Sequence, residues 1–345
     1  MTDTDAHILT TGGVIRDSVI TADGRVSLEQ MGGNAVYSAV GARLWSDRVA
    51  LAGNVAANYP DALLDRLRAA GIGCDGIDRA PEEVSETEWF LNNADGSRVD
   101  HLYAPSQVFQ AFGFAEPLDA EDRARFLSRL QTRTPEGLGF GALRQLYPVS
   151  VDQALRAAPG PRIVHLAPEN LSAQADLIAA FRARGAILSL DPGSSGAQSP
   201  REVETLAGQV DIFLPSQKEL AAMRPGLSPA AALMDLGRTT SAVLAVKIGA
   251  EGALLLDRDT DRIVHVPALE VDAPDPVGAG DAFCGGFAAG YLAGRDVRHA
   301  AACGTVSASF AVGGFGALHA LTATPDEIAR RHRAIGFNTL PEFSR

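Results

Sequence analysis

The sequence is poor in several features that define large classes of protein. It has only three cysteines, Cys74, Cys284 and Cys303, which are scattered and show no metal-ligand spacing. Neither a disulfide framework nor a cysteine-rich metal site is therefore expected. The same cysteine content indicates a reducing compartment. No apolar run approaches the roughly 20 residues of a membrane span, and the first residues lack the basic and apolar segments of a signal peptide. We expect a cytoplasmic protein without a membrane partner.

Positive charge is also scarce. The 30 Lys and Arg residues are outnumbered by 42 Asp and Glu residues, so the formal net charge is −12. Nucleic acids and anionic membranes are bound through basic patches, and no such patch is visible, so neither is expected as a partner. What is present is ordinary globular material, 345 residues that are 46% hydrophobic, without repeats or low-complexity tracts.

From residue 160 onward, short apolar runs alternate with stretches that have helical character. The runs are RIVHLAP, AILSLDPG, VDIFLPS, AVLAVKIG and GALLLD, and the segments SAQADLIAAFRARG, REVETLAGQ and SPAAALMDLGRTT lie between the first four. Continuous apolar strands that alternate with helices are typical of parallel sheets buried on both faces. The pattern predicts an α/β fold, a doubly wound and mainly parallel sheet flanked by helices.

The first hundred residues combine this pattern with a second one. HILTTGGVI and DRVALAGNV resemble core strands, and NAVYSAVGARLW and PDALLDRLRAAG resemble helices, the second ending at Gly71. Segments 14–32 and 86–103 instead resemble strands that flank ADG and NADG turns. We expect these two segments to pair as a small sheet outside the core, a lid. Residues 105–160 predict short helices and are interpreted as an elaboration on a single domain, 1–345.

The stretch DAPDPVGAGDAFCGGF, residues 272–287, places glycines and a carboxylate where a helix begins. The free N–H groups and the positive end of the helix dipole favour an anion there, and small residues let a phosphate approach the backbone. A carboxylate at this position is useful for accepting a proton from a nucleophile while the amides hold a phosphoryl group. The stretch therefore favours phosphoryl transfer over a simple helix cap, with glycine geometry expected at Gly280.

DPVGAGDAFCGGF is similar to the signature of the ribokinase-like (PfkB) carbohydrate kinases, and four further elements follow the order of that family. These are GGVIRDSV, MGGNAVYSAVGARLW, LPSQKEL and KIGAEGALL. The resemblance covers most of the chain outside residues 105–160. It implies a kinase that uses ATP and Mg²⁺ to phosphorylate a hydroxyl, expected to be a primary one, of a sugar or sugar-like molecule.

The resemblance also implies roles for particular residues. Asp281 would be the base, and the Gly278, Ala279 and Gly280 amides would form an anion hole. Substrate contacts would come from Asp17, Gly32, Gly33, Asn34 and Tyr37. ATP would lie along Ser216, Lys247, Gly249, Gly252 and Thr305. Glu219 would organise Mg²⁺ indirectly, and Asp275 and the Val277 carbonyl would hold a monovalent cation such as K⁺. A homodimer formed through the lid would be one possible assembly.

Four positions depart from the usual pattern of this family. Tyr37 stands where a substrate-contacting Asn is usual, so the identity of the sugar cannot be transferred. Ser216 replaces the Asn of N-x-x-E, Lys247 replaces a Thr, and Pro276 replaces another Thr. Lys247 could reach a phosphate, and a solvated lysine at the end of a strand is an equal alternative.

Other residues have duller explanations that we weigh against functional ones. GIGCDG, residues 71–76, spells a dinucleotide motif, but a helix precedes it, so we interpret it as a helix stop and turn. A surface role for His101 and a core role for His165 are favoured over ligand contact, and Glu169 is an outside candidate for a sugar contact. Trp89 and Phe90 should face opposite sides of a strand. The alternatives to a sugar kinase are a nucleoside kinase, a catalytically weak regulator, and an NAD oxidoreductase resting on GIGCDG alone.

Overall fold

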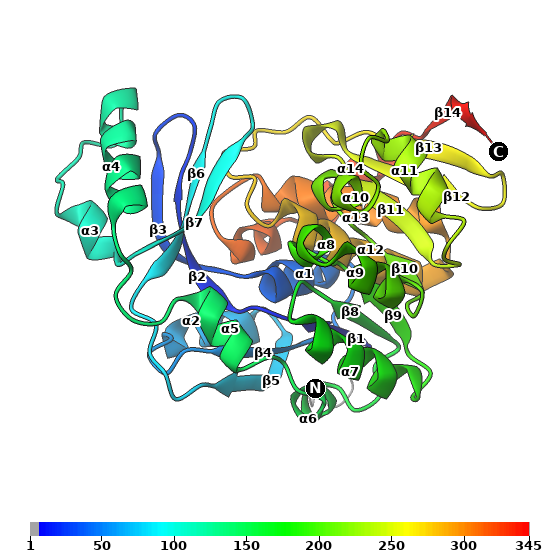
Figure 1. The fold of residues 1–345 in the computed structure, drawn as a ribbon, viewed down its shortest axis with the longest axis horizontal. Helices are drawn as coiled ribbons and strands as arrows, with labels where there is room; N and C mark the ends of the chain where they lie inside the picture. The colour runs from blue at the N-terminus through cyan, green and yellow to red at the C-terminus, as the bar shows by residue number, and fades with distance from the viewer. Residues whose placement is uncertain (1–6, 345) are drawn as a thin grey trace.

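The computed structural model describes residues 7–344 and contains two β-sheets wrapped by helices (Figure 1). The large sheet has ten strands in the order β14-β13-β12-β11-β10-β9-β8-β1-β4-β5. Their bounds are β1 Ile8–Thr11, β4 Val49–Val55, β5 Ile72–Arg79, β8 Ile163–Leu166, β9 Ile187–Leu190, β10 Ile212–Phe213, β11 Val243–Lys247, β12 Ala253–Asp257, β13 Arg262–Val266 and β14 Asn338–Ser344.

The strands from β5 to β11 run parallel, and β12, β13 and β14 add antiparallel strands at one edge. The predicted mainly parallel, doubly wound sheet is thereby confirmed. One detail of the prediction is wrong: residues 72–76 of GIGCDG lie in the edge strand β5 and not in a turn. Only Gly71, at φ +78°, ends the preceding helix as expected, so no strand–glycine turn–helix unit for NAD exists there.

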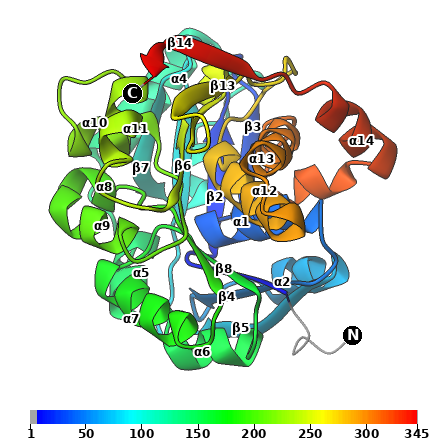
Figure 2. The same cartoon turned by 90° about the vertical axis from the view of Figure 1, so that its right-hand side faces the viewer.

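Helices cover both faces of this sheet (Figure 2). One face buries side chains of α1, α2, α12 and α13, and the other those of α6, α7, α9, α10 and α11. The helix bounds are α1 Asn34–Arg43, α2 Asp61–Ala69, α3 Ser106–Gln110, α4 Ala120–Thr132, α5 Phe140–Leu146, α6 Val151–Ala157, α7 Leu171–Arg182, α8 Ser195–Gln198, α9 Pro200–Ala207, α10 Gln217–Met223, α11 Pro229–Leu236, α12 Ala279–Gly294, α13 Val297–Ala311 and α14 Pro325–Arg333, with 3₁₀ turns at Gly249–Glu251 and Ala317–Thr322. Within residues 7–344, none of these helices has the length and apolar character required to cross a bilayer.

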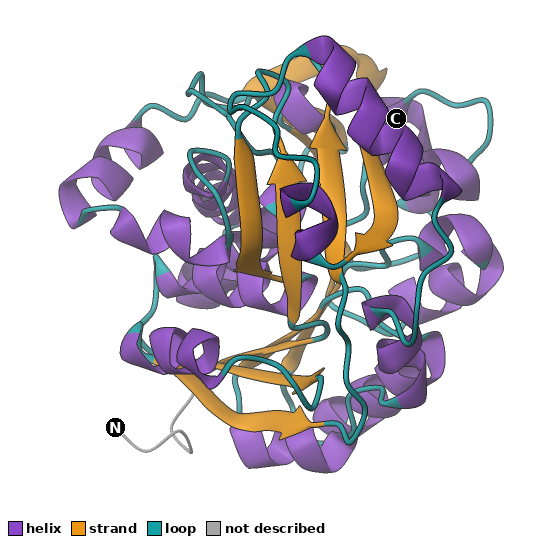
Figure 3. Cartoon of the chain, turned by 90° about the vertical axis from the view of Figure 1, so that its left-hand side faces the viewer, coloured by secondary structure: helices purple, strands orange, loops and turns teal. Residues whose placement is uncertain are grey.

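The second sheet has four strands, in the order β3-β2-β6-β7, and Figure 3 looks onto it from the left-hand side of Figure 1. Its strands are β2 Ile15–Ile20, β3 Val26–Gly32, β6 Thr87–Asn92 and β7 Arg98–Ala104. The two hairpins predicted around the ADG and NADG turns therefore do pair, through parallel β2 and β6. HILTTGGVI is not one core strand, because the chain leaves the large sheet after Thr11 and enters the small one at Ile15.

Residues 105–160 form four helices, α3 to α6, which pack against the two sheets. Phe109 of α3 and Phe126 of α4 pack on Trp89, whose indole is fully buried on the outer side of the small sheet. Phe90, the next residue, belongs to the main core instead, so the predicted opposite facing of this pair is correct. Since Trp89 is covered by α3 and α4, it is not available to a substrate.

Candidate active site

The loop DPVGAGD leads into α12 at the centre of the molecule. Gly278 is the N-cap residue with φ +74°, and the helix begins at Ala279. The amides at the start of a helix have no intrahelical partners and point outward. Asp281 lies in the first turn and is partly buried. The predicted start of a helix in this stretch, with Asp281 in its first turn, is therefore confirmed.

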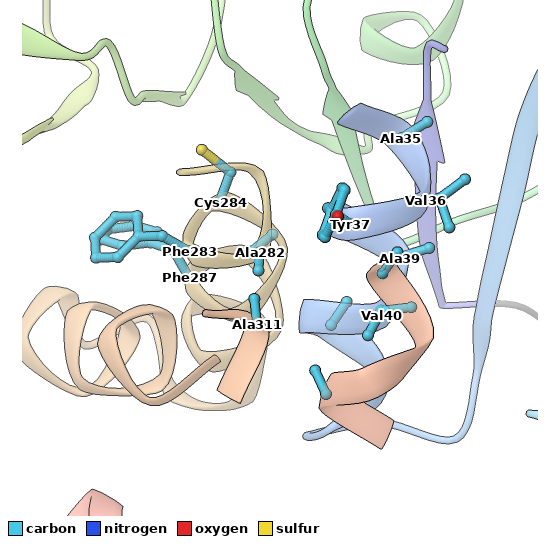
Figure 4. Packing of buried hydrophobic residues seen from close by; sticks show 14 of the residues in the cluster. Ala35, Val36, Tyr37, Ala39, Val40, Ala282, Phe283, Cys284, Phe287 and Ala311 are labelled. Atoms are coloured by element: carbon cyan, nitrogen blue, oxygen red, sulfur yellow. The ribbon is translucent and has the colours of Figure 1, made fainter. Parts of the chain in front are cut away.

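The need for glycine in this loop is set by α1. A Cβ on Gly278 would lie inside the ring of Tyr37, which points from α1 toward α12 (Figure 4). Gly280 has no positive φ, and a Cβ there would sit 3.5 Å from the Lys247 side chain. The expectation of glycine geometry at Gly280 is thus wrong, and the position that requires it is Gly278. Tyr37 is buried at 2% exposure.

Further along α12, glycines let helix backbones touch directly. A Cβ on Gly285 would overlap the carbonyl of Ser38 in α1, and a Cβ on Gly286 would collide with Ser307 of α13. On the α1 side, a Cβ on Gly41 would overlap the backbone of Ala282. The anion-binding end of α12 is therefore held by three helices in backbone contact.

A buried charge cluster lies beside this helix terminus. Lys247, at the end of β11, forms an ion pair with Asp191, at the end of β9, and both side chains are largely buried. The Cys284 thiol lies 3.4 Å from Lys247 Nζ and 3.4 Å from Asp191 Oδ2. Burial alone would lower the pKa of Lys247, but the charges of Asp191, Cys284 and Glu219, together with the hydrogen bond to Asp191, outweigh it and the pKa is raised. Lys247 is therefore a buried cation beside Gly280, not a solvated lysine.

Acidic groups outnumber cations in this region, and the pKa values of two of the carboxyl groups are raised. Burial, reinforced by the charge of Asp191, raises the pKa of Asp281 from 3.8 to about 7. The same two causes raise the pKa of Glu219 from 4.5 to about 7. Buried carboxylates whose pKa values are raised to about 7 are typical of catalytic and cation-binding sites. A bound cation would lower both pKa values, since it supplies the charge that the cluster lacks.

The predicted substrate residues meet where β2, the end of β3 and the start of α1 come together. Asp17 is fully buried against Gly32, where a Cβ would overlap its carboxylate, and its Oδ1 has no hydrogen-bond partner among the described residues. Burial, followed by the charges of Glu88 and Asp275, raises the pKa of Asp17 well above its ordinary range. Gly33, at φ +103°, lets α1 begin directly against the Gly13 carbonyl.

Asn34 is less free than the prediction required. Its Oδ1 accepts the Gly13 amide at 2.7 Å and its Nδ2 donates to the Pro168 carbonyl at 2.7 Å. The side chain therefore ties the turn between the two sheets to the end of β8. This gives it a positioning role in the structure, whatever it contributes to substrate.

The predicted nucleotide residues lie at the ends of β10 and β11. Ser216 bridges to Lys247 across these strands and caps α10, while Glu219 Oε2 accepts the Ser216 amide at 2.6 Å. Gly249 and Gly252, at φ +67° and +102°, shape the turn that follows β11. Thr305 lies on the neighbouring α13, and its buried hydroxyl has no partner among residues 7–344.

Asp275 begins the loop that precedes α12. Its Oδ1 accepts the Val277 amide at 3.0 Å and the Asn92 side-chain amide at 3.4 Å, the latter from the small sheet. Its Oδ2 is buried and has no partner among the described residues. Burial raises the pKa of Asp275 to about 6. An orphaned carboxylate oxygen of this kind suits a cation with oxygen ligands.

The histidine candidates divide as expected. His101 is exposed on the small sheet and contacts Glu88 at 3.2 Å. His165 is buried, with Nδ1 3.1 Å from the Ser189 hydroxyl, and burial lowers its pKa to about 4. Glu169 lies 3.7 Å from Arg144 and accepts the Asn170 amide.

Three charged residues of the site were missed by sequence analysis. Asp191 follows a predicted strand, and the rule that ligands bind at the carboxyl ends of parallel strands could have identified it. Arg144 comes from α5, inside the segment 105–160, and Arg98 from β7, where no local pattern marks either one. Both arginines lie close enough to Asp281 for their charges to lower its pKa.

Comparisons with known proteins agree with this geometry. Residues 163–324 match the model of the pfkB family carbohydrate kinases. The chain is 36% identical over 130 residues to the deoxyribokinase of Salmonella typhi, a match that covers 35% of this chain and 40% of that protein. Overall, the chain spans about half the length of the first curated relatives it matches.

Solved structures extend the likeness to the whole fold. A ribokinase from Cryptococcus neoformans in complex with ADP superposes with a TM-score of 0.67 at 18% identity, covering 94% of this chain and 99% of that chain. A nucleoside kinase from Burkholderia thailandensis in complex with inosine gives a TM-score of 0.67 at 19% identity, covering 96% and 98%. At these identities the likeness shows the fold, including the smaller sheet.

Proposed function

We propose that this chain, whose residues 163–324 match the pfkB family carbohydrate kinases and whose fold is similar to that of a ribokinase, transfers the γ-phosphate of ATP to a hydroxyl of a sugar or sugar-like molecule. The observation that carries the proposal is the pairing of a carboxylate, Asp281, with the glycine-lined start of α12. The amides hold the transferring group while the carboxylate removes the proton of the nucleophile.

In this proposal Asp281 accepts the proton of the acceptor hydroxyl, whose oxygen attacks the γ-phosphorus as the bond to ADP breaks. Its pKa near 7 suits a general base that works close to neutral pH. The backbone amides at Gly278, Ala279 and Gly280 stabilise the charge that develops on the phosphoryl oxygens. Lys247, which is held by Asp191 beside Gly280, adds a fixed positive charge at the same place.

The chemistry of the site also fits two kinds of cation. The site has an excess of buried carboxylates, and the pKa values of Glu219 and Asp281 are both raised to about 7. Such a site suits Mg²⁺ near the nucleotide phosphates. Mg²⁺ would neutralise charge on the transferring phosphates. The unpartnered oxygen of Asp275 and the Val277 carbonyl would hold a monovalent cation such as K⁺ at the base of the same loop.

The acceptor would lie between the small sheet and the start of α1, against Asp17 and Gly32–Gly33. We propose that the small sheet closes over it as a lid, since Asn92 already reaches from β6 to Asp275. A nucleoside is the second candidate acceptor, favoured by the likeness to a nucleoside kinase in complex with inosine.

The test is a panel of sugars, sugar acids, sugar phosphates, polyols and nucleosides, scored by coupled ADP release with ATP and Mg²⁺. We expect turnover with at least one hydroxyl compound that exceeds ATP hydrolysis without acceptor. If ATP binds but no member of the panel accelerates ADP release, the chain is a catalytically weak binder on this fold and the proposal fails.

A further inference from the structure

Two histidines and a cysteine converge on the opposite flank from the charge cluster, where α13 meets α14. His299 and Cys303 lie four residues apart on α13, so both side chains are on one face of that helix. His332 reaches them from α14, and one ligand atom of each residue lies within 4.8 Å of the other two. The spacing between cysteines does not reveal this His-x-x-x-Cys pair, because two of the three converging residues are histidines.

The geometry of the pair matches a tetrahedral metal. Zinc bonds of about 2.0–2.1 Å to nitrogen and about 2.3 Å to sulfur, at a tetrahedral angle, place the two ligand atoms about 3.6 Å apart. Cys303 Sγ and His299 Nε2 are 3.6 Å apart. In the metal-free protein this is a thiol–imidazole contact, and binding of the ion would release the thiol proton.

His332 is poised as a third ligand. Its Nε2 is buried and has no hydrogen-bond partner among residues 7–344. The ring is fixed by edge contacts with Trp45, at 5.5 Å between ring centroids, and with His299, at 5.1 Å.

A cavity of about 390 Å³ opens at this cluster, and His299 and His332 form part of its wall. The remaining wall is mainly apolar, from Leu44, Trp45, Pro325 and Ile328. The cavity gives an ion a route from solvent and leaves room for a water molecule as fourth ligand. In Figure 2, α14 lies at the right, beside α13.

We propose that His299, Cys303 and His332 form a binding site for Zn²⁺ that fastens α14 to α13. One sulfur and two nitrogens are the borderline-soft ligand set that selects zinc over the hard Mg²⁺ expected near Asp281. Because α13 also carries Thr305, two residues from Cys303, the ion would fix the helix that borders the nucleotide region. The site is independent of the proposed kinase activity.

The test titrates Co²⁺ into the full chain, reduced with a non-chelating phosphine, with excess Mg²⁺ present to occupy carboxylate sites. We expect one Co²⁺ per chain, with a thiolate charge-transfer band and the intense visible bands of tetrahedral cobalt, both lost on adding Zn²⁺. Cys303→Ala should abolish the charge-transfer band. His332→Gln should weaken binding at least about 100-fold, since even outer partners of metal ligands contribute 10–100-fold.

Matched controls separate the site from general metal binding. His265→Gln changes a half-buried histidine on β13 that contacts the Glu251 carbonyl, and Cys74→Ala changes a buried cysteine on β5. Both should bind Co²⁺ as the unmodified chain does. His332 lies on the outermost helix, so circular dichroism should show that His332→Gln is folded. Absence of a charge-transfer band in the reduced unmodified chain, or its persistence in Cys303→Ala, would overturn the site.

Discussion

Replacing Asp281 by Asn should remove activity and raise thermal stability in the same molecule. The substitution keeps the shape of the side chain but removes its charge and its capacity to accept a proton. Loss of a general base typically costs 10²–10⁴-fold in rate, and ATP affinity should change little. At about 1.36 kcal/mol for each pKa unit, a pKa displaced from 3.8 to about 7 means that ionised Asp281 destabilises the fold by at most about 4 kcal/mol.

The pH dependence of this stability gain follows from the sign of the displacement. Below pH 4 the carboxyl is protonated in both the folded and the unfolded chain, so the variant gains nothing. Between pH 4 and 7 the unfolded chain loses its proton first, and the advantage of Asn grows until it is constant above pH 7. At about 2 °C per kcal/mol for a chain of this size, the melting temperature without ligands should rise by up to about 8 °C at pH 8.

The assay is thermal unfolding of both proteins from pH 4 to pH 9, without nucleotide or divalent cation, together with coupled turnover. Asp272→Asn, an exposed change on the same loop, is the matched control and should show neither effect. A stability difference that does not vary with pH would refute the electrostatic argument. Retention of more than about a tenth of kcat would refute the assignment of the base.

Gly278→Ala should lower the melting temperature markedly, because residue 278 has a φ of +74° and the added Cβ would overlap the ring of Tyr37. Gly280→Ala should instead fold normally and lose mainly kcat, and equal melting curves for the two variants would contradict this reasoning. Lys247→Met removes a cation that lowers the pKa of the base, so the acidic limb of the pH–rate profile should move to higher pH, and an unchanged limb would count against it. Asp275→Asn should abolish any stimulation by K⁺ over Na⁺ at constant ionic strength, and stimulation that survives would place the cation elsewhere. Shortening the hairpin tip, residues 92–97, to a two-residue turn should leave the core folded, weaken acceptor binding and raise ATP hydrolysis relative to transfer. Hydrogen exchange should show that both small-sheet segments gain protection when the acceptor and a non-hydrolysable ATP analogue are added. Protection confined to residues 105–160 would instead identify that segment as the lid.

Periodicity and local rules predicted the elements that are determined locally. The apolar runs are strands in the structure, and the glycine-rich stretch is the start of α12. The helix start could be predicted because the residues that begin a helix lie within a few positions of one another in the sequence. The pairing of segments 14–32 and 86–103 was predicted from turn residues and alternation. The course of HILTTGGVI was not, because one apolar run can serve two sheets when a glycine pair bends the chain between them.

The parts of the site that sequence analysis missed depend on contacts between distant segments. Lys247 is a buried cation only because Asp191, 56 residues earlier, meets it at the strand ends. Arg144 lies on α5, and no local sequence pattern around that helix marks it as a site residue. The strained glycine is Gly278 and not Gly280 because the ring of Tyr37 occupies the space where a Cβ would go. Such features follow from three-dimensional packing and leave no periodic trace in the sequence.

The glycine contacts among α1, α12 and α13 have a mechanical consequence. Where side chains separate two helices, a change of rotamer lets one helix slide on the other, but helices whose backbones touch at Gly285 and Gly41 have no such layer to yield. The start of α12 is therefore held rigidly. In the proposed mechanism, the closing motion would come from the small sheet, whose Asn92 contacts Asp275 at the base of the loop, and the acceptor would move toward a phosphate site that stays fixed.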